Sequence, residues 1–320
     1  MRAIVVTELG GPEVLAAAEH PDPEPGPGEV VVETAAAGVN FIDIYRRSGV
    51  YQQPLPYVPG HEGAGTVLAV GEGVTDVAVG DRVAWHDAPG SYAERVVVPA
   101  ALTVPVPDGT DLIAAAAVIL QGMTAHYLCR STFPVTDATV AVVHAAAGGV
   151  GLLLTQMIKT IGGTVIATTS SEPKAELARQ AGADYVVGYG EFGDTVGQVT
   201  RGRGADVVYD GVGKATFDAG LAALRPRGMM VLFGGSSGQV PPLDPQRLNS
   251  GGSLFLTRPT LADYTADRDE LLWRATDVLN AVAAGQLNVR IGTEYSLAHA
   301  PRAHEDLAGR RTTGKLLLIP

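Results

Sequence analysis

The sequence predicts an α/β protein in which a doubly wound, six-stranded parallel sheet lies between the two parts of a β-rich domain. The chain has 320 residues, which is too long for most single hydrophobic cores and favours two domains. Residues 1 to about 110 hold short β-like runs that proline and glycine interrupt. From about residue 111 to 260, apolar β-branched runs alternate with helical patterns, as they do in a parallel sheet whose strands are joined by helices.

The first region is predicted to form a compact, irregular β domain. Its runs have the residue types and lengths that are typical of strands. The predicted strands are Ala3–Val6, Val30–Glu33, Gly65–Val70, Arg82–Trp85 and Ala93–Val98.

The middle region is predicted to form the parallel sheet, with helices between most of its strands. Its strands are predicted at Thr139–Val143, Thr164–Thr168, Tyr185–Val187, Asp206–Tyr209, Met229–Phe233 and Leu254–Thr257. Its helices are predicted at Leu152–Ile161, Lys174–Ala181, Phe192–Arg201 and Phe217–Leu224. The tail adds a helix at Asp267–Ala284 and a strand at Lys315–Ile319. We expect this tail to return to the first domain, so the predicted domains are 1–122 together with 261–320, and 123–260.

The composition bounds the function classes. Hydrophobic residues make up 46% and charged residues 18% of the chain, which is typical of a folded globular protein. The net charge of −11 argues against nucleic acid as a partner, because an acidic surface repels phosphate backbones. We expect no membrane span, since Asp, Arg, Gly or Pro interrupts each apolar run, and the first residues lack the pattern of a signal peptide. These features predict a cytoplasmic enzyme.

A glycine-rich turn follows the first strand of the middle region. Gly148 and Gly151 stand in a G-x-x-G spacing between a buried strand and a helix, although Ala146 replaces a further glycine of the usual fingerprint. Gly148 is expected to let the backbone approach a pyrophosphate, and Gly151 to let the helix pack closely on the strand. The free N–H groups of the helix then point at the phosphates. With six strands in sequence, this predicts a Rossmann dinucleotide-binding domain; the binding residues of the turn are Ala147, Gly148, Gly149, Val150 and Gly151.

The end of the second strand of this domain predicts NADPH as the cofactor. An NAD site usually has an acidic residue there, which binds the 2′-hydroxyl of the ribose. Here the strand ends in threonines and serines, including Thr169 and Ser170, and Lys174 follows one turn later. Hydroxyls and a cation suit a 2′-phosphate, which a carboxylate would repel. Glu172 complicates this prediction, because a shift of one turn would bring its carboxylate near the ribose.

The chain resembles the zeta-crystallin type quinone oxidoreductases, the zinc-free branch of the medium-chain dehydrogenase/reductase superfamily. The resemblance is carried by Ala145-Ala-Ala-Gly-Gly-Val-Gly151, Gly38-Val-Asn-Phe-Ile-Asp-Ile-Tyr45 and Leu256-Thr-Arg-Pro-Thr260. It extends to Gly80-Asp-Arg-Val83 and to the final Thr313-Gly-Lys-Leu-Leu-Leu-Ile-Pro320. The resemblance implies a GroES-like catalytic domain built from both ends of the chain, with the Rossmann domain inserted in it. It also implies a homodimer joined through an edge strand, for which the candidate is Ser253–Thr257.

The resemblance also implies residues that act near the nicotinamide. Asn40 is expected to hydrogen-bond the ribose or a substrate oxygen, and Tyr45 and Tyr51 to stack on a flat acceptor or donate to its oxygen. Asp43 and Thr124 complete this predicted catalytic set, in which Asn40, Tyr45 and Thr124 also contact the cofactor. The remaining predicted cofactor-binding residues lie after later strands or in the tail: Tyr189, Gly211, Gly213, Phe233, Gly234, Gly235, Ser236, Arg258 and Arg310.

No catalytic zinc is expected. Zinc alcohol dehydrogenases of the superfamily use two cysteines and the histidine of a Gly-His-Glu motif, and this chain has Gly60-His-Glu62. However, Asn40 stands where the first cysteine would be, and Cys129 is the only cysteine in the chain. A catalytic zinc site needs about three good protein ligands. We therefore interpret His61 as a hydrogen-bonded pocket or core histidine.

Without zinc, the predicted chemistry is reduction of an acceptor that takes a hydride readily, because the Lewis acid needed for alcohol oxidation is missing. The leading prediction is NADPH-dependent reduction of quinones. An NADPH-dependent enone or alkenal double-bond reductase is the alternative on the same fold. A third alternative is an NADPH-binding structural or RNA-binding protein with little turnover, as some crystallin relatives are, although the acidic charge disfavours the RNA version.

Overall fold

The computed structural model describes residues 1–320. The chain divides into two compact units, one formed by Met1–Met123 with Asp267–Pro320 and the other by Thr124–Ala266. The second unit is therefore inserted in the sequence of the first. The domain boundaries predicted from the sequence, after residues 122 and 260, stay a prediction.

The inserted unit contains a six-stranded sheet in which every pair of neighbours is parallel. In spatial order the strands are β10 (Tyr185–Val187), β9 (Thr164–Thr168), β8 (Val140–Val143), β11 (Ala205–Asp210), β12 (Leu224–Leu232) and β13 (Phe255–Thr257). Counted along the chain, this order is 3-2-1-4-5-6, which is the strand order of dinucleotide-binding folds. The predicted Rossmann sheet is confirmed.

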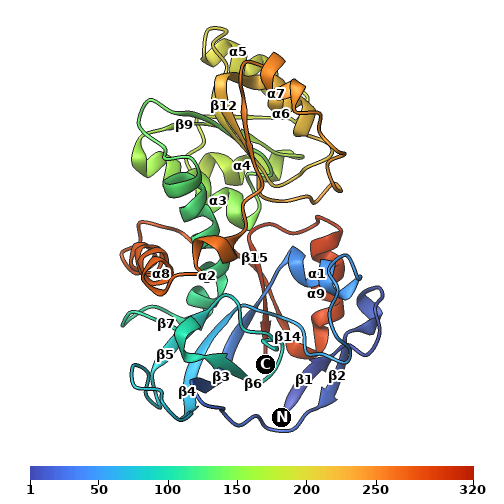
Figure 1. Ribbon diagram of the computed structural model, residues 1–320, viewed down its shortest axis with the longest axis vertical. Coiled ribbons are helices and arrows are strands. Elements are labelled where there is room, and N and C mark those ends of the chain that lie inside the picture. The colour runs from blue at the N-terminus through green and yellow to red at the C-terminus, as the bar shows by residue number, and fades with distance from the viewer. The chain divides into compact units, whose positions relative to one another are not determined.

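Helices connect the strands of this sheet and pack against it (Figure 1). They are α3 (Gly149–Ile161), α4 (Glu172–Gln180), α5 (Phe192–Val199), α6 (Phe217–Ala223) and α7 (Gln246–Ser250). The apolar strands are buried because helices cover the sheet, as a parallel sheet requires. One core cluster joins Val142 and Val208 of the strands to Phe192 and Phe217 of the helices.

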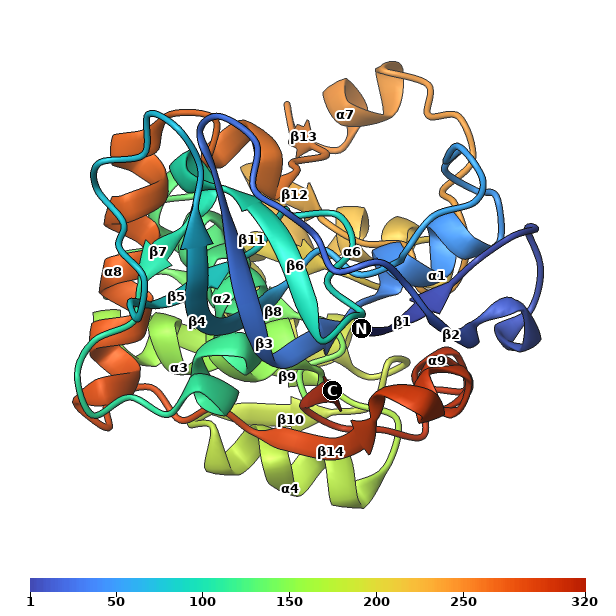
Figure 2. The ribbon, with the colours of Figure 1, turned by 90° about the horizontal axis from the view of Figure 1, so that it is seen from below.

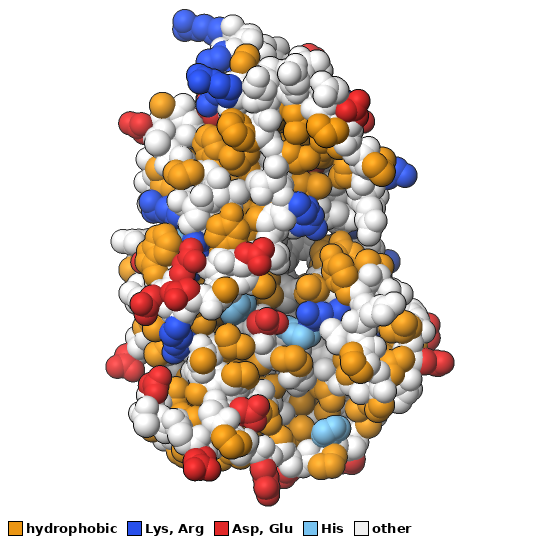
Figure 3. Space-filling model, in the orientation of Figure 1, with side chains coloured by type: hydrophobic (Ala, Val, Ile, Leu, Met, Phe, Trp, Pro, Cys, Tyr) orange, Lys and Arg blue, Asp and Glu red, His pale blue; other side chains and the backbone are white.

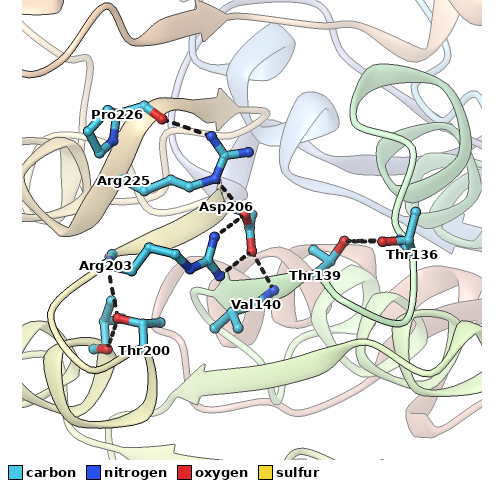
Figure 4. Close-up of polar contacts among 10 residues, drawn as sticks. Thr136, Thr139, Val140, Thr200, Arg203, Asp206, Arg225 and Pro226 are labelled. Carbon is cyan, nitrogen blue, oxygen red and sulfur yellow. Dashed lines mark hydrogen bonds and ion pairs between the residues drawn. The ribbon is translucent and has the colours of Figure 1, made fainter.

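A buried carboxylate ties together three strands at the end of the sheet where they begin. Asp206 accepts hydrogen bonds from the Val140 N–H at 2.8 Å, from both terminal nitrogens of Arg203 at 2.8 and 3.0 Å, and from Arg225 at 2.5 Å (Figure 4). Burial raises the pKa of the Asp206 carboxyl, but these hydrogen bonds outweigh it and lower the pKa to about 2. The hydrogen-bond network around Asp206 stabilises the sheet without facing the glycine-rich turn. Basic side chains gather on the surface near α5 (Figure 3).

The unit made from both ends of the chain contains a mixed seven-stranded sheet. Its strands are β14 (Ile291–Ser296), β15 (Lys315–Ile319), β3 (Glu29–Val39), β4 (Gly63–Val70), β5 (Arg82–Trp85) and β7 (Val104–Pro105) in spatial order, with β6 (Arg95–Pro99) paired to β3. Figure 2 shows β3, β4 and β6 side by side. A separate hairpin joins β1 (Arg2–Val5) to β2 (Ala16–Glu19). Because β15 pairs with β3, the tail completes the sheet of the first region, as predicted.

Strand β3 is much longer than the predicted Val30–Glu33. It extends to Val39 through a run of alanines and a glycine, residues that are uncommon in strands. These small residues fit because β3 is paired on both sides there, to β4 and to β15, and is largely buried. Packing of the sheet decides the conformation of this segment, and its local sequence does not reveal it.

The sequence predicted only some of the helices of this unit. The predicted tail helix is α8 (Arg268–Ala283), whereas α9 (Ala300–Ala308) and strand β14 were not predicted. Short α1 (Phe41–Arg47) follows β3 directly. Helix α2 (Leu112–Tyr127) was also missed, because it is apolar all round and shows no helical stripe.

The prediction that no apolar run is long enough to cross a membrane is wrong for one segment. By length and composition, the helical segment Leu112–Thr132 is long and apolar enough to cross a membrane, because it carries almost no charge. Of its most apolar window, 72% is buried inside the protein, which is the behaviour of a core helix. By itself, such a helix is weak evidence for a membrane span.

Candidate functional site

The turn between β8 and α3 is held in place by both neighbouring strands. The His144 N–H donates to the Tyr209 carbonyl at 3.0 Å, and the Ala146 N–H donates to the Thr168 carbonyl at 3.1 Å. Ala145 adopts a left-handed conformation with φ of 52°, and its carbonyl accepts the Gly148 N–H at 2.9 Å. The turn therefore reverses the chain without a glycine at Ala146.

Helix α3 begins at Gly149, three residues before the predicted start at Leu152. Gly148 is the N-cap residue in an extended conformation. The glycines and Val150 thus form the first turn of the helix, where N–H groups have no partner within the helix. Those N–H groups and the positive end of the helix dipole are suited to bind phosphate.

The two predicted glycines have different steric environments. A Cβ on Gly151 would lie 2.5 Å from the Ala145 carbonyl oxygen and 2.7 Å from Ala146 Cα, so only glycine fits. A Cβ on Gly148 would meet only the Ala145 oxygen, at 3.2 Å, and would otherwise enter open space. Gly151 therefore serves close packing, while the backbone at Gly148 has open space beside it; that a pyrophosphate approaches there stays a prediction.

The end of β9 presents hydroxyl groups and no carboxylate. Thr169 is buried directly after the strand, and Ser170 is exposed beside it. Lys174 lies in the first turn of α4. Glu172, which complicated the prediction of NADPH, accepts a hydrogen bond from Arg179 of the same helix at 2.7 Å. This hydrogen bond lowers the pKa of Glu172 and directs its carboxylate along α4.

The loops after β11 and β12 pack against each other. The Ser236 N–H donates to the Gly211 carbonyl at 3.2 Å, and a Cβ on Gly234 would lie 2.6 Å from that oxygen. Gly213 has φ of 89° and faces the backbone of Gly235. The structure thus brings together the predicted residues of both loops, including Phe233, whose ring lies beside Gly211.

Asp210 organises the first of these loops and was not predicted. Its buried carboxylate accepts the N–H groups of Val212 at 2.7 Å and Gly213 at 2.9 Å, and the Thr216 hydroxyl at 2.8 Å. The signal in the sequence was an acidic residue between the strand and two glycines.

His144 is a second residue that the sequence analysis did not single out. It is buried at the end of β8, where its Nδ1 lies 2.8 Å from the Thr168 hydroxyl. Its ring meets that of Phe192 edge to face and lies 5.9 Å from the ring of Tyr189, a predicted cofactor residue. Burial lowers the pKa of His144 to about 4, against the attraction of Asp210, so the ring is neutral at pH 7.

The predicted residues of the other unit meet at α1. Asn40 is the N-cap residue, and its N–H donates to Asp43 Oδ2 at 2.9 Å, one half of a capping box. The rings of Tyr45 and Tyr51 meet edge to face with centroids 5.9 Å apart. Phe41 lies next to Tyr45 at 6.2 Å. Tyr51 is 46% exposed, so this row of rings leads from the protein to solvent.

A buried polar network joins Asp43 of α1 to Tyr92 and to His304 of α9. Asp43 Oδ2 also accepts the Tyr92 hydroxyl at 3.1 Å, and that hydroxyl lies 3.1 Å from Nε2 of His304 on α9. Burial raises the pKa of Asp43 and lowers the pKa of His304 to about 3. Tyr92 and His304 were not predicted, because they come from segments distant in sequence.

The side chain of Asn40 is held by two fully buried charged residues, Glu62 and Lys315. Neither was proposed as a site residue, although Glu62 belongs to the Gly-His-Glu motif.

The other predicted site residues are more scattered. Thr124 is buried in α2, at the start of the inserted unit. Arg258 is exposed after β13, and Arg310 is exposed after α9 with φ of 54°.

The residues around the Gly-His-Glu motif do not fit a zinc ion. His61 Nδ1 lies 3.4 Å from Asp87 Oδ1, a contact that lowers the pKa of Asp87. The only cysteine, Cys129, is buried and donates to the His126 carbonyl at 3.7 Å. Nowhere in the chain do three histidine, cysteine or acidic side chains gather in a way that would hold a metal. His86, next to Asp87 in the sequence, is buried.

Comparisons with known proteins agree with this fold. The family described as "Alcohol dehydrogenase GroES-like domain" matches residues 26–108, and the family "Zinc-binding dehydrogenase" matches residues 149–265. The second match contains neither a cysteine nor a histidine, so that family name gives no zinc ligand here. Together the fold and the two matches define a medium-chain dehydrogenase/reductase.

The chain is similar over its whole length to named reductases. A quinone oxidoreductase of Pseudomonas aeruginosa is 44% identical and covers 100% of this chain and 99% of its own. A 2-haloacrylate reductase of a Burkholderia species is 39% identical, with coverage of 99% and 98%. A mycobacterial protein solved in complex with NADPH is 48% identical, covers 100% of both chains and superposes with a TM-score of 0.97. The chain belongs to the quinone oxidoreductase family.

Proposed function

We propose that this protein is an NADPH-dependent reductase of quinones that works without zinc. The observation that carries the proposal is the turn between β8 and α3, whose first-turn N–H groups and Gly148 leave room for a pyrophosphate. The mycobacterial neighbour with this fold holds NADPH, and the full-length relatives are oxidoreductases. This favours an enzyme over a structural or RNA-binding protein.

The preference for NADPH rests on the end of β9. We propose that Thr169, Ser170 and Lys174 bind the 2′-phosphate, because hydroxyls and an ammonium group complement its charge. The Glu172 carboxylate, which would repel that phosphate, is instead paired with Arg179.

The rest of the cofactor is proposed to lie along the ends of the strands. The turn residues Ala147 to Gly151 bind the pyrophosphate, and Tyr189 and the loops after β11 and β12 contact the remainder. Gly211, Gly213, Gly234 and Gly235 let the backbone come close. Phe233, Ser236, Arg258 and Arg310 are proposed as further contacts.

The acceptor is proposed to bind at α1. Tyr45 and Tyr51 offer aromatic faces and hydroxyls to a flat, conjugated ring. Asp43 fixes Asn40 by accepting its backbone N–H, and we assign it the task of holding the start of α1. Thr124 is proposed to contact the nicotinamide.

NADPH, when bound, supplies a hydride or two electrons. Reduction of a quinone to a hydroquinone takes up two electrons and two protons, so with a hydride one further proton is needed. Water can supply this proton, because a hydroquinone anion is basic. No side chain is therefore required as an acid. The protein's residues orient the two reactants and exclude competing reactions.

A second acceptor class is favoured by one relative. The name of the 2-haloacrylate reductase denotes an alkene conjugated to a carboxylate, and that protein matches this chain over its full length. Enones and alkenals are therefore the alternative acceptors, because conjugation stabilises the charge that a hydride delivers.

The chain is further proposed to form a homodimer in the cytoplasm. Strand β13 is the edge of the parallel sheet, and Phe255 and Leu256 on it are 55% and 36% exposed. An apolar edge strand needs a cover, which a second copy would provide. The mass of the protein in solution, measured by light scattering, tests this proposal.

The function is tested by following NADPH oxidation with a panel of quinones, enones and alkenals. We expect turnover with quinones, a preference for NADPH over NADH, and no loss of activity with a chelator. Turnover of alkenals without turnover of any quinone would move the protein to the alternative function. Preference for NADH would contradict the assignment of Lys174, and loss of activity with chelator would reinstate a metal.

A further inference from the structure

A fully buried ion pair lies beside Asn40. Glu62 stands just before β4 and Lys315 begins β15, and their side chains are 0% and 1% exposed. The two strands flank β3, so the pair meets across that strand. Gly38 of β3 makes this possible, because a Cβ there would overlap the Glu62 carboxylate and lie 2.7 Å from Lys315 Cε.

Asn40 closes a triangle with this pair. Its Oδ1 accepts a hydrogen bond from Lys315 Nζ at 2.8 Å, and its Nδ2 donates to Glu62 Oε2 at 2.7 Å. The opposite orientation of the amide would place its NH₂ group against the ammonium and its oxygen against the carboxylate. The ion pair therefore fixes which way the amide of Asn40 points.

The other oxygen of Glu62 is also occupied. Oε1 accepts the N–H of Leu120 in α2 at 2.9 Å, so the carboxylate cannot turn to release Asn40 without losing that bond. Replacing a buried ion pair by apolar residues of similar volume is often neutral or stabilising. Stability alone is thus a poor explanation for this pair, whereas control of the amide explains its geometry.

This orientation decides what Asn40 offers to a ligand. The second hydrogen of Nδ2 points toward the Gly38 carbonyl at 3.4 Å, while Oδ1 keeps one lone pair beyond its bond to Lys315. The amide is therefore better suited to accept a hydrogen bond than to donate one. A sugar hydroxyl is a fitting partner, and a quinone oxygen, which only accepts, is not.

We infer that Glu62 and Lys315 are positioning residues that hold Asn40 as the acceptor for a ribose hydroxyl in the nicotinamide half of NADPH. This inference rests on the proposed function, which places NADPH in this protein, and it settles the choice between ribose and substrate oxygen for Asn40. The pair acts through Asn40 and touches neither cofactor nor acceptor.

The test compares two ligands. The double variant Glu62→Gln with Lys315→Met removes both charges with little change of shape, and dissociation constants are measured by calorimetry for NADPH and for 2′,5′-ADP. The second ligand has the adenosine half and its phosphates but no nicotinamide ribose. We expect the dissociation constant of NADPH to rise by about tenfold, as for the loss of one well-formed hydrogen bond, and that of 2′,5′-ADP to stay within twofold.

Two further measurements separate positioning from a general loss of structure. Asn40→Ala should weaken NADPH binding by a similar factor, and should weaken it little further in the double variant, because all three residues act as one unit. The control removes another ion pair, in α8, in which Arg274 is fully buried and Glu270 is partly exposed, through Glu270→Gln with Arg274→Met, and should change neither constant. Should the double variant not fold, Glu62→Gln alone must show the same selectivity for NADPH at smaller magnitude.

The outcomes are distinct. Equal weakening of both ligands, unchanged NADPH binding, or additive effects of Asn40→Ala would each overturn the inference while leaving the proposed function in place. If the wild-type protein binds no NADPH, the proposed function itself is overturned, and the inference with it.

Discussion

Replacing Gly151 by alanine should weaken cofactor binding and destabilise the fold together. The added Cβ would lie 2.5 Å from the Ala145 carbonyl oxygen, whereas ordinary contact begins at 3.4 Å. The added Cβ is thus about 0.9 Å too close, and the atoms that it meets belong to the backbone, so the turn or the helix must move by about that distance. Overpacking of this kind typically costs ~1–3 kcal/mol of stability.

The displacement falls on the first turn of α3, which carries the N–H groups proposed to bind the pyrophosphate. A misplacement of about 1 Å in a positioned group can cost ~10²-fold, so we expect the dissociation constant of NADPH to rise by about 30- to 100-fold. Calorimetry gives this constant, and urea denaturation gives the accompanying loss in the free energy of unfolding.

Two other glycines provide controls. Gly148→Ala meets only one atom, at 3.2 Å, so it should cost little stability and weaken NADPH binding by obstructing the open side of the turn. Gly197→Ala lies in α5 with nothing within 4 Å and should stabilise the protein by about 0.5–1 kcal/mol without affecting NADPH. The reasoning is refuted if Gly151→Ala binds NADPH within twofold of the wild type while remaining folded.

Three more predictions concern charge and pH. Burial lowers the pKa values of His144 and His304 to about 4 and about 3, so below pH 6.5 the unfolded chain binds more protons than the folded protein, and stability is lost as the pH falls. At pH 5 each histidine should lower the free energy of unfolding by about 2 kcal/mol, which urea denaturation measures. A free energy of unfolding that does not change between pH 6.5 and pH 5 would contradict this. Asp206→Asn removes a carboxylate that three donors share and should cost about 1–3 kcal/mol at pH 7 with unchanged NADPH affinity, whereas a loss of affinity would show that the network reaches the cofactor. Lys174→Ala should raise the KM for NADPH by about tenfold and leave that for NADH unchanged, and equal changes in the two constants would exclude contact with the 2′-phosphate.

The parts of the protein that the sequence predicts well are those that local signals determine. Strand β8, the turn and the neighbouring strands follow from apolar β-branched runs and from glycines at fixed spacing, and the parallel sheet has the expected order. The start of α3 was misplaced because glycine disfavours a helix, yet Gly149 and Gly151 occupy its first turn, where close packing requires them.

The parts that the sequence does not reveal depend on distant contacts. Glu62 and Lys315 are separated by 253 positions and meet only because β4 and β15 flank β3. Tyr92 and His304 are separated by 212 positions and join the support of α1 in the same way. Each of these residues taken alone is an ordinary polar residue, and only the sheet order assigns it a place in the site.

The central claim is that this chain transfers reducing equivalents from NADPH to a quinone. The most direct measurement is a single-turnover experiment in which protein and NADPH are mixed rapidly, without oxygen and with chelator, with a simple 1,4-benzoquinone. The account predicts loss of NADPH absorbance in proportion to the quinone added, much faster than without protein and much slower when NADH replaces NADPH. A rate no greater than that of the uncatalysed reaction would contradict it.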